Sequence, residues 1–449
     1  ALNPPFIPFS SSGNDPNGAF ILVDTTATAT ATASATPTPV LTPIGAPSAT
    51  PTAAPTSAVP SPNASSTGLP SATPSATPAV VAEALLAGGS DNTIDASGNH
   101  PTLASAEVYN EATGAFSPTG SMAYPRLGHT ATMLHNGKIL VAGGHNGFSK
   151  RAMPSAELYD VKTGSFSFTG SMNSARLGHA AIVLKNGMVL VSGGMNVDFS
   201  VVNLAELYDP ASGQFSPTGS LMDARMGHTA TMLKDGSILV AGGANDSGLL
   251  ASAELFNASG TTNVTVGPMG TPRQNATATL LGNGKVLITG GAANTASCTG
   301  CATDTAEIYN PATATFAPTG KMHSSRRGHS ATLLPDGRVL IAGGVDDAAG
   351  TALDSTEIYN PATATFTPAA PMHLARFDHA AITLYDGKVL FAGGSEGSST
   401  ITNSAEIYDP AKGTFKATGA MTDSRADAGT ACFESGSAGS KPSSRGVLK

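Results

Sequence analysis

The sequence has 449 residues, of which 12% are charged, with 51 glycines, three cysteines, no tryptophan and a formal net charge of −8 at pH 7. This acidic balance disfavours nucleic acid and anionic membrane surfaces as partners, and no apolar run reaches the roughly 18 residues of a membrane span. The many glycines and few aromatics are typical of an all-β chain with short strands and tight turns.

The first 79 residues form two segments that differ from the rest of the chain. Residues 1–24 carry an apolar head with a β-prone run, and its large side chains are Phe6, Ile7, Phe9, Phe20, Ile21, Leu22 and Val23. Such a short strand cannot bury itself, so we expect it to dock on its own domain, another molecule or a surface. Residues 25–79 are dominated by Thr, Ser, Pro and Ala and carry no charge. They predict an extended linker, either plain disordered chain or an O-glycosylated stalk.

From about residue 80 the chain repeats with a period of about 50 residues, which is the size of one four-stranded propeller blade. The clearest copy reads R-L-G-H-T-A-T-M-L-H-N-G-K-I-L-V-A-G-G from Arg126 to Gly144, followed by A-E-L-Y-D at residues 156–160 and a T-G element after the fourth apolar run. The N-G or D-G pair between the first two runs is the strongest short hairpin signal. Strands joined by such turns are antiparallel, so each copy predicts four antiparallel strands.

This pattern resembles the Kelch repeat, over roughly residues 80–433. Kelch blades carry a Gly-Gly pair after the second strand, a Tyr in the third and an aromatic residue in the fourth. The glycine pairs begin at Gly88, Gly143, Gly193, Gly242, Gly290, Gly343 and Gly393. The third-strand residues are Tyr109, Tyr159, Tyr208, Phe256, Tyr309, Tyr359 and Tyr408. The fourth-strand Phe is present except in the fourth copy, which has Val264 or a neighbour there, and the usual fourth-strand Trp is absent throughout.

The repeat register predicts how the ring closes. The first copy lacks its R-x-G-H-T-A-T strand, whereas the last is followed by Arg425 and A-G-T-A-C-F at residues 428–433. This last segment should therefore complete the first blade and remove the open edges. The expected fold is an all-β, seven-bladed Kelch-like propeller over residues 80–433, closed by a C-terminal strand, with a tail at residues 434–449.

Each copy contains one Glu before its Tyr and one Arg at the blade junction. The glutamates are Glu107, Glu157, Glu206, Glu254, Glu307, Glu357 and Glu406. The arginines are Arg126, Arg176, Arg225, Arg273, Arg326, Arg376 and Arg425. In a chain poor in charge, these equal counts predict a repeated, largely buried Arg–Glu pair with a structural role. Seven equivalent acids cannot converge on one catalytic site.

Five histidines share one repeat position: His129, His179, His228, His329 and His379. A metal ring is conceivable, but equivalent positions on neighbouring inner strands are spread around a ring and do not meet at one ion. We therefore expect structural histidines.

The three cysteines are Cys298 and Cys301, in a C-T-G-C loop, and Cys432 in the closing strand. The loop pair predicts a small disulfide, with a zinc half-site as the alternative, and Cys432 predicts a buried thiol. Sequons at Asn63, Asn245, Asn257, Asn263 and Asn275 permit N-glycosylation.

Three classes of function remain open. The first is a secreted, non-enzymatic surface or matrix scaffold that polymerises head to tail through the N-terminal arm. Secretion would fit a chain that begins at Ala1, although Met excision would give the same start. The second is a carbohydrate- or protein-binding propeller of the adhesin kind. The third is a Kelch-type enzyme, resembling galactose oxidase or the sialic-acid epimerases.

We predict the scaffold, with no cofactor. The oxidase pattern needs a Cys cross-linked to a Tyr together with further Tyr and His ligands, and Cys432 is the only Cys outside the C-T-G-C loop. An active propeller should also gather unrepeated polar residues at one mouth, and the candidates are Asp198, Asp246, Asp346, Asp347, Asp354 and Glu396.

Overall fold

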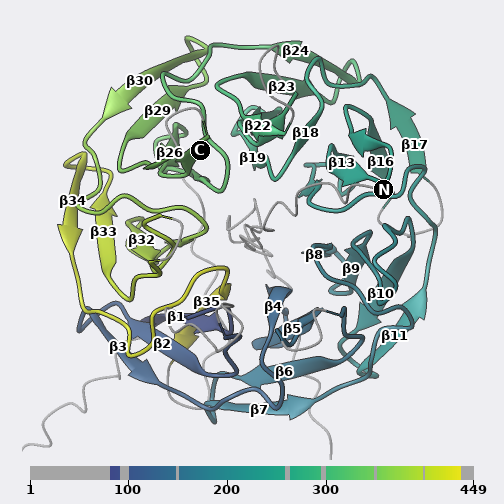
Figure 1. Ribbon diagram of the computed structural model, residues 1–449, viewed down its shortest axis with the longest axis vertical. Coiled ribbons are helices and arrows are strands. Elements are labelled where there is room, and N and C mark those ends of the chain that lie inside the picture. Colours follow the sequence, from purple (N-terminus) through teal and green to yellow (C-terminus); the bar gives the residue numbers. More distant parts are fainter. Residues whose placement is uncertain are drawn as a thin grey trace, which may run out of the picture. The chain divides into compact units, whose positions relative to one another are not determined.

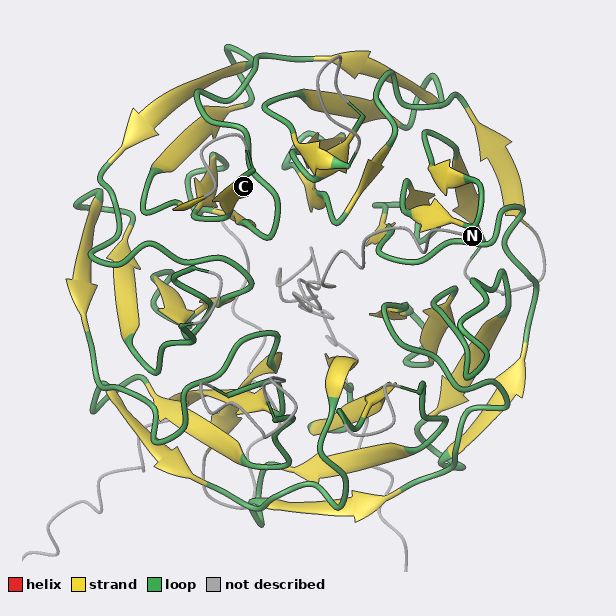
Figure 2. Ribbon diagram, viewed as in Figure 1, coloured by secondary structure: helices red, strands yellow, loops and turns green. Residues whose placement is uncertain are grey.

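The computed structural model describes residues 81–435 except 92–100, 148–150, 258–262, 295–299, 348–350 and 398–399. The described residues form seven four-stranded antiparallel sheets around a common axis (Figure 1). They contain strands and turns but no helix, and therefore none that could cross a membrane (Figure 2). The predicted head, linker and most of the predicted tail lie outside the described residues.

The blades follow the repeat in chain order, and each is given from its inner to its outer strand. Blade 1 is β35 (Gly429–Ser435), β1 (Val81–Ala87), β2 (Ala106–Asn110) and β3 (Ala115–Pro118). Blade 2 is β4 (Leu127–Met133), β5 (Lys138–His145), β6 (Ala156–Asp160) and β7 (Ser165–Phe168). Blade 3 is β8 (Ala180–Val183), β9 (Val189–Ser192), β10 (Ala205–Asp209) and β11 (Gln214–Pro217). Blade 4 is β12 (Thr229–Met232), β13 (Ile238–Ala241), β16 (Ala253–Phe256) and β17 (Asn263–Val266).

The remaining blades have the same order. Blade 5 is β19 (Thr277–Leu280), β20 (Val286–Thr289), β23 (Ala306–Asn310) and β24 (Thr315–Pro318). Blade 6 is β25 (Ser330–Leu333), β26 (Val339–Ala342), β29 (Thr356–Asn360) and β30 (Thr365–Ala369). Blade 7 is β31 (Ala380–Thr383), β32 (Val389–Ala392), β33 (Ala405–Asp409) and β34 (Thr414–Ala417). Short loop strands are β14 (Ala244–Asn245), β15 (Gly248–Leu249), β18 (Arg273–Gln274), β21 (Ala292–Ala293), β22 (Cys301–Ala302), β27 (Val345–Asp346) and β28 (Thr351–Ala352).

The two ends of the propeller sequence meet in blade 1, as the repeat register predicts. β35 pairs antiparallel with β1, with Ala431 opposite Leu85 and Thr430 opposite Leu86. The inner strands then contact one another in the closed order β35, β4, β8, β12, β19, β25, β31 and back to β35. Closure thus pairs the edge of β1 that the missing first strand of copy one would leave open.

The hydrophobic core is divided among the spaces between blades. A typical cluster joins Leu85 and Met122 of blade 1 to Ile139, Val141 and Tyr159 of blade 2, all of them buried. Each second strand reads as a continuous apolar run because both of its faces pack against neighbouring blades. One repeat unit therefore cannot bury its own apolar surface, and the ring is the smallest stable unit.

The glycine pairs are required by the close approach of adjacent blades. Gly143 has a φ of 68°, and a Cβ placed there would lie 2.6 Å from the Arg176 carbonyl oxygen of the next junction. The next residue uses this proximity, because the Gly144 N–H donates to the Arg176 carbonyl at 2.9 Å. The repeat therefore keeps two glycines here for both conformational and steric reasons.

Candidate functional site

The repeated Arg and Glu form a buried ion pair in each blade. The seven distances are 2.9 Å for Arg126–Glu157, 2.7 Å for Arg176–Glu206, 3.1 Å for Arg225–Glu254, and 2.9 Å for Arg273–Glu307, Arg326–Glu357, Arg376–Glu406 and Arg425–Glu107. The arginine also donates to main-chain carbonyls, as Arg126 Nη1 does to Gly143 and Ser155 at 2.9 Å. All 14 charges are therefore committed to joining strands, which is the structural role that the equal counts predict.

The glutamate of each pair also holds the chain that arrives from the preceding blade. Glu206 Oε2 accepts a hydrogen bond from Asn173 N at 2.7 Å, and Glu157 Oε2 accepts one from Ala123 N at 2.8 Å. Burial raises the pKa of Glu206, but hydrogen bonds from Asn173, Arg176 and Ser174 outweigh burial and lower the pKa overall. The Glu206 carboxylate therefore stays ionised and holds the segment that arrives from the preceding blade.

A second repeated contact, which the sequence analysis missed, joins the outer strands. The Tyr of one blade bonds the Thr that follows the outer strand of the preceding blade, in Tyr109–Thr418, Tyr159–Thr119, Tyr208–Thr169 and Tyr359–Thr319, at 2.8–2.9 Å. The Thr of the T-G element could have indicated this contact, because it recurs in the sequence at a fixed spacing from the Tyr. At the other three junctions, the described residues show no such bond for Phe256, Tyr309 or Tyr408.

The five repeat histidines lie in the blade interfaces, not at a metal site. Each Nε2 lies within hydrogen-bond distance of an oxygen on the preceding blade, as His129 does with Ala87 O at 3.1 Å and His379 with Ser330 Oγ at 2.9 Å. Burial, followed by repulsion from Arg126, lowers the pKa of His129 to about 3. These rings are therefore neutral at physiological pH and bridge blades.

Within the described residues, no three His, Cys, Asp or Glu side chains form a group that could hold a metal. Cys432 Sγ donates to Thr383 O at 3.4 Å, and the residue is half-buried, not fully buried as the sequence suggested. Cys301 in β22 is disulfide-bonded, whereas its predicted partner Cys298 lies outside the described residues.

The unrepeated loop acids lie in loops of blades 3, 4, 6 and 7, and within the described residues no three of them form a group that could hold a metal. Asp347 forms a two-pronged ion pair with Arg327 at 2.7 and 2.8 Å and accepts a bond from Ala302 N, so it joins the loops of blades 5 and 6. Asp198 and Asp246 are exposed at loop tips of blades 3 and 4.

The sequons differ in how much of the side chain is available. Asn245 Oδ1 accepts a bond from Ser247 N in an exposed turn. Asn263 occupies the position opposite Phe256 where other blades have Phe, while Val264 points outward and is 62% exposed. The Asn263 amide nitrogen donates to Ser220 O and Glu254 Oε2, so a glycan there would remove at least one structural bond. Asn63 lies outside the described residues.

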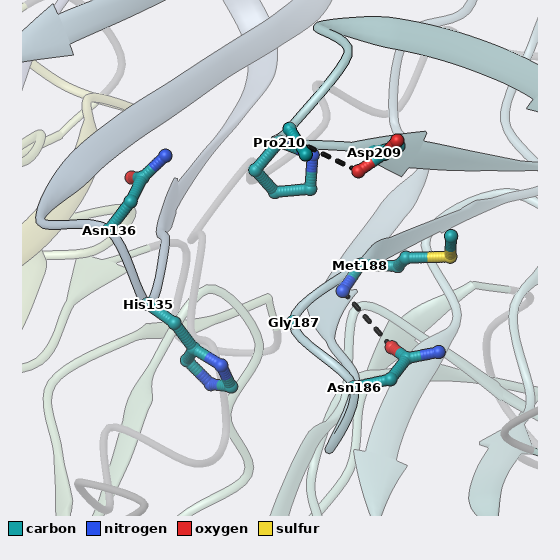
Figure 3. A pocket seen from close by; sticks show the side chains of 8 residues that line it. His135, Asn136, Asn186, Gly187, Met188, Asp209 and Pro210 are labelled. Atoms are coloured by element: carbon teal, nitrogen blue, oxygen red, sulfur yellow. Dashed lines mark hydrogen bonds between the residues drawn. The ribbon is translucent and has the colours of Figure 1, made fainter. Parts of the chain in front are cut away.

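An open cleft of about 350 Å³ lies between the turns of blades 2 and 3 (Figure 3). It is lined by His135, Asn136, Asn186, Gly187, Met188, Asp209, Pro210 and Ala211. Its polar groups hold turns: Asn186 Oδ1 accepts from Met188 N at 3.0 Å and Asp209 Oδ1 from Ala211 N at 2.9 Å (Figure 3). The cleft follows from repeat geometry and does not by itself indicate a ligand.

Comparisons with known proteins support the resemblance seen in the sequence. A KLHDC2/KLHL20/DRC7 Kelch-repeats domain matches residues 178–394, and a Kelch motif matches residues 126–173. No curated protein sequence matches the chain. Among solved structures, a fungal alcohol oxidase of the AA5 family in complex with copper has a TM-score of 0.55 and 20% identity, covering 71% of this chain and 70% of that one. At that identity the likeness concerns the fold alone.

Proposed function

The chain belongs to the Kelch-repeat β-propeller family, and we propose that it is a non-enzymatic scaffold of a surface or extracellular matrix. A scaffold or protein-binding role is what the Kelch propeller fold supports. In our proposal the propeller is a rigid module, residues 25–79 are a glycosylated spacer, and residues 1–24 dock on a second copy. Such a contact is heterologous, and its repetition without closure gives a filament.

One observation carries this proposal: the polar residues that recur in the chain serve to join blades. The buried Arg–Glu pairs and the histidines hold the ring together and leave the described residues without a group that could hold a metal. The apolar head, in contrast, has no such role in the repeat. An apolar segment on a polar spacer is suited to assembly, because strand addition gains main-chain hydrogen bonds without a special sequence.

The test compares the full chain with a chain lacking residues 1–24. Sedimentation velocity and electron microscopy should show ordered polymers for the full chain and monomers for the truncated chain. Substitution of Phe20 and Leu22 by Asp, which keeps the length of the arm, should also give monomers. A full chain that stays monomeric at high concentration, unchanged by truncation, would defeat the proposal.

A further inference from the structure

Four of the eight exposed large apolar side chains in the described residues fall within residues 197–222. They are Val197, Phe199, Leu204 and Met222, which are 37%, 49%, 44% and 57% exposed. We call them the blade-3 rim. Leu221 N donates to Asn203 O at 2.8 Å and Asn203 Nδ2 donates back to Leu221 O at 3.1 Å. Leu204 and Met222 each lie one residue from this bonded pair, so the two are close together.

Leu204 departs from the repeat. The equivalent residue in the other six blades is a Ser or Thr, and its hydroxyl accepts a bond from the buried arginine in Ser105, Ser155, Ser252, Thr305, Ser355 and Ser404. In blade 3, Arg176 has no hydroxyl partner at this position. It keeps Glu206 and the Leu204 carbonyl, and its Nε donates instead to Ser174 O at 3.3 Å. An exposed apolar residue at a position that is Ser or Thr in the other six blades is best explained by a contact outside the fold.

Phe199 is held outward by a strained backbone. Its φ is 63°, a left-handed conformation that bulky residues rarely adopt. The hairpin tip is nevertheless well fixed, because Asn196 Oδ1 accepts from Asp198 N at 2.9 Å and from Ser200 N at 3.1 Å. Local strain maintained by a rigid turn is typical of recognition sites.

We propose that the blade-3 rim is the docking surface for the N-terminal segment, residues 1–24, of a second copy of this chain. The assignment rests on the proposed function and names the surface that receives the arm. The segment supplies the matching chemistry, since its Phe6, Phe9 and Phe20 are apolar and residues 25–80 between it and the propeller carry no charge. As polyproline II, at ~3.1 Å per residue, this spacer spans on the order of 170 Å, so reach is not limiting.

The direction of the strands allows the arm to join stacked copies. β1 runs from Val81 toward Gly88, so the arm joins blade 1 at the end of the strand away from its glycine pair. The rim follows the equivalent glycine pair of blade 3, Gly193-Gly194, at the opposite end of the strands. β1 therefore begins at one face of the ring, and the rim lies at the other face. Copies stacked in the same orientation would bring the two together.

The experiment titrates a labelled peptide of residues 1–24 against full-length chains and reads fluorescence anisotropy. The acceptor chains carry Phe20→Asp and Leu22→Asp, so that their own heads do not compete. Leu204→Ser, which restores the residue of the other blades, should weaken binding by about tenfold or more, as loss of a buried leucine contact does. Phe199→Asn, which suits the left-handed backbone, should weaken binding similarly while the fold is kept. Val264→Thr, an exposed apolar position on the outer strand of blade 4, should leave binding within about twofold of the acceptor.

Saturable binding that Leu204→Ser and Phe199→Asn weaken, and Val264→Thr does not, supports the assignment. Absent binding, or equal binding in all acceptors, overturns it. The assembly of chains with wild-type heads is measured separately. If these chains polymerise and Leu204→Ser chains polymerise equally well, the rim assignment fails and the scaffold proposal stands. If they remain monomeric, the scaffold proposal fails, and the peptide titration decides the rim independently.

Discussion

The inner and outer parts of the blade junctions have diverged to different extents. Near the inner strands, all seven blades keep the buried Arg–Glu pair. At the outer strands, only four junctions in the described residues keep the Tyr–Thr bond. The energetics explain the difference. Removing one partner of a buried ion pair costs about 3–5 kcal/mol, whereas a neutral hydrogen bond contributes only about 1 kcal/mol. The residues near the outer strands can therefore vary and acquire other roles.

The largest expected effect comes from opening the inner ring. Removal of residues 422–449 deletes β35 and Arg425, which leaves the β1 edge unpaired and Glu107 buried without its cation. We expect unfolding or aggregation, measured by thermal unfolding and sedimentation. Removal of residues 436–449 alone, which spares β35, is the matched control and should change little. An unchanged melting temperature in the longer deletion would contradict the closure.

A single inner pair should be the next most sensitive element. Glu206→Ala leaves Arg176 buried without its carboxylate and frees the Asn173 N–H. We expect a loss of about 3–5 kcal/mol in the free energy of unfolding, measured by denaturant titration. Asp246→Ala, at an exposed loop acid, is the control and should stay within about 0.5 kcal/mol of the parent. A loss below about 1 kcal/mol for Glu206→Ala would mean that the pair is dispensable.

Removal of a Tyr hydroxyl near the outer strands should change the free energy of unfolding by a small amount that differs between blades. Tyr208→Phe loses the bond to Thr169 at 2.8 Å and should cost about 0.5–1.5 kcal/mol. The Tyr309 hydroxyl is buried and has no hydrogen-bond partner in the described residues. Tyr309→Phe should therefore be neutral or stabilising, because it removes an unsatisfied polar group. Equal losses of unfolding free energy in the two variants, measured in the same titration, would refute the distinction between junctions with and without the Tyr–Thr hydrogen bond.

The sequence predicted what is repeated and missed what is particular to one blade. The missing first strand of the first copy located the pairing of β35 with β1, and the equal counts of Arg and Glu located the ion pairs. Leu204 differs in the sequence from the Ser or Thr of the other six copies, but its exposure could not be predicted, because an apolar side chain at the start of a strand can equally be part of the core. The left-handed φ of Phe199 is likewise set by a turn whose hydrogen bonds the sequence does not reveal. The place of Asn263 opposite Phe256, where either Val264 or a neighbour was expected, depended on strand register.

The smallest expected effect is a pH dependence at the seam between blades 7 and 1. Glu111 accepts bonds from Tyr385 N at 3.3 Å and Asp386 N at 3.2 Å, and Lys388 pairs with the same Asp386. Burial, and then the hydrogen bond and repulsion from the Asp386 carboxylate, raise the pKa of Glu111 to about 7 from an ordinary value of 4.5. A carboxyl whose pKa is raised by folding does not destabilise the folded state below pH 4.5, where it is protonated in both the folded and the unfolded state. It disfavours the folded state progressively as the pH rises from 4.5 to about 7. Glu111→Gln should therefore melt with the parent near pH 4 and above it by a small margin at pH 7, since the group is partly exposed and screened. A margin that is the same at both pH values would mean that Glu111 titrates normally and that the seam behaves like the other outer junctions.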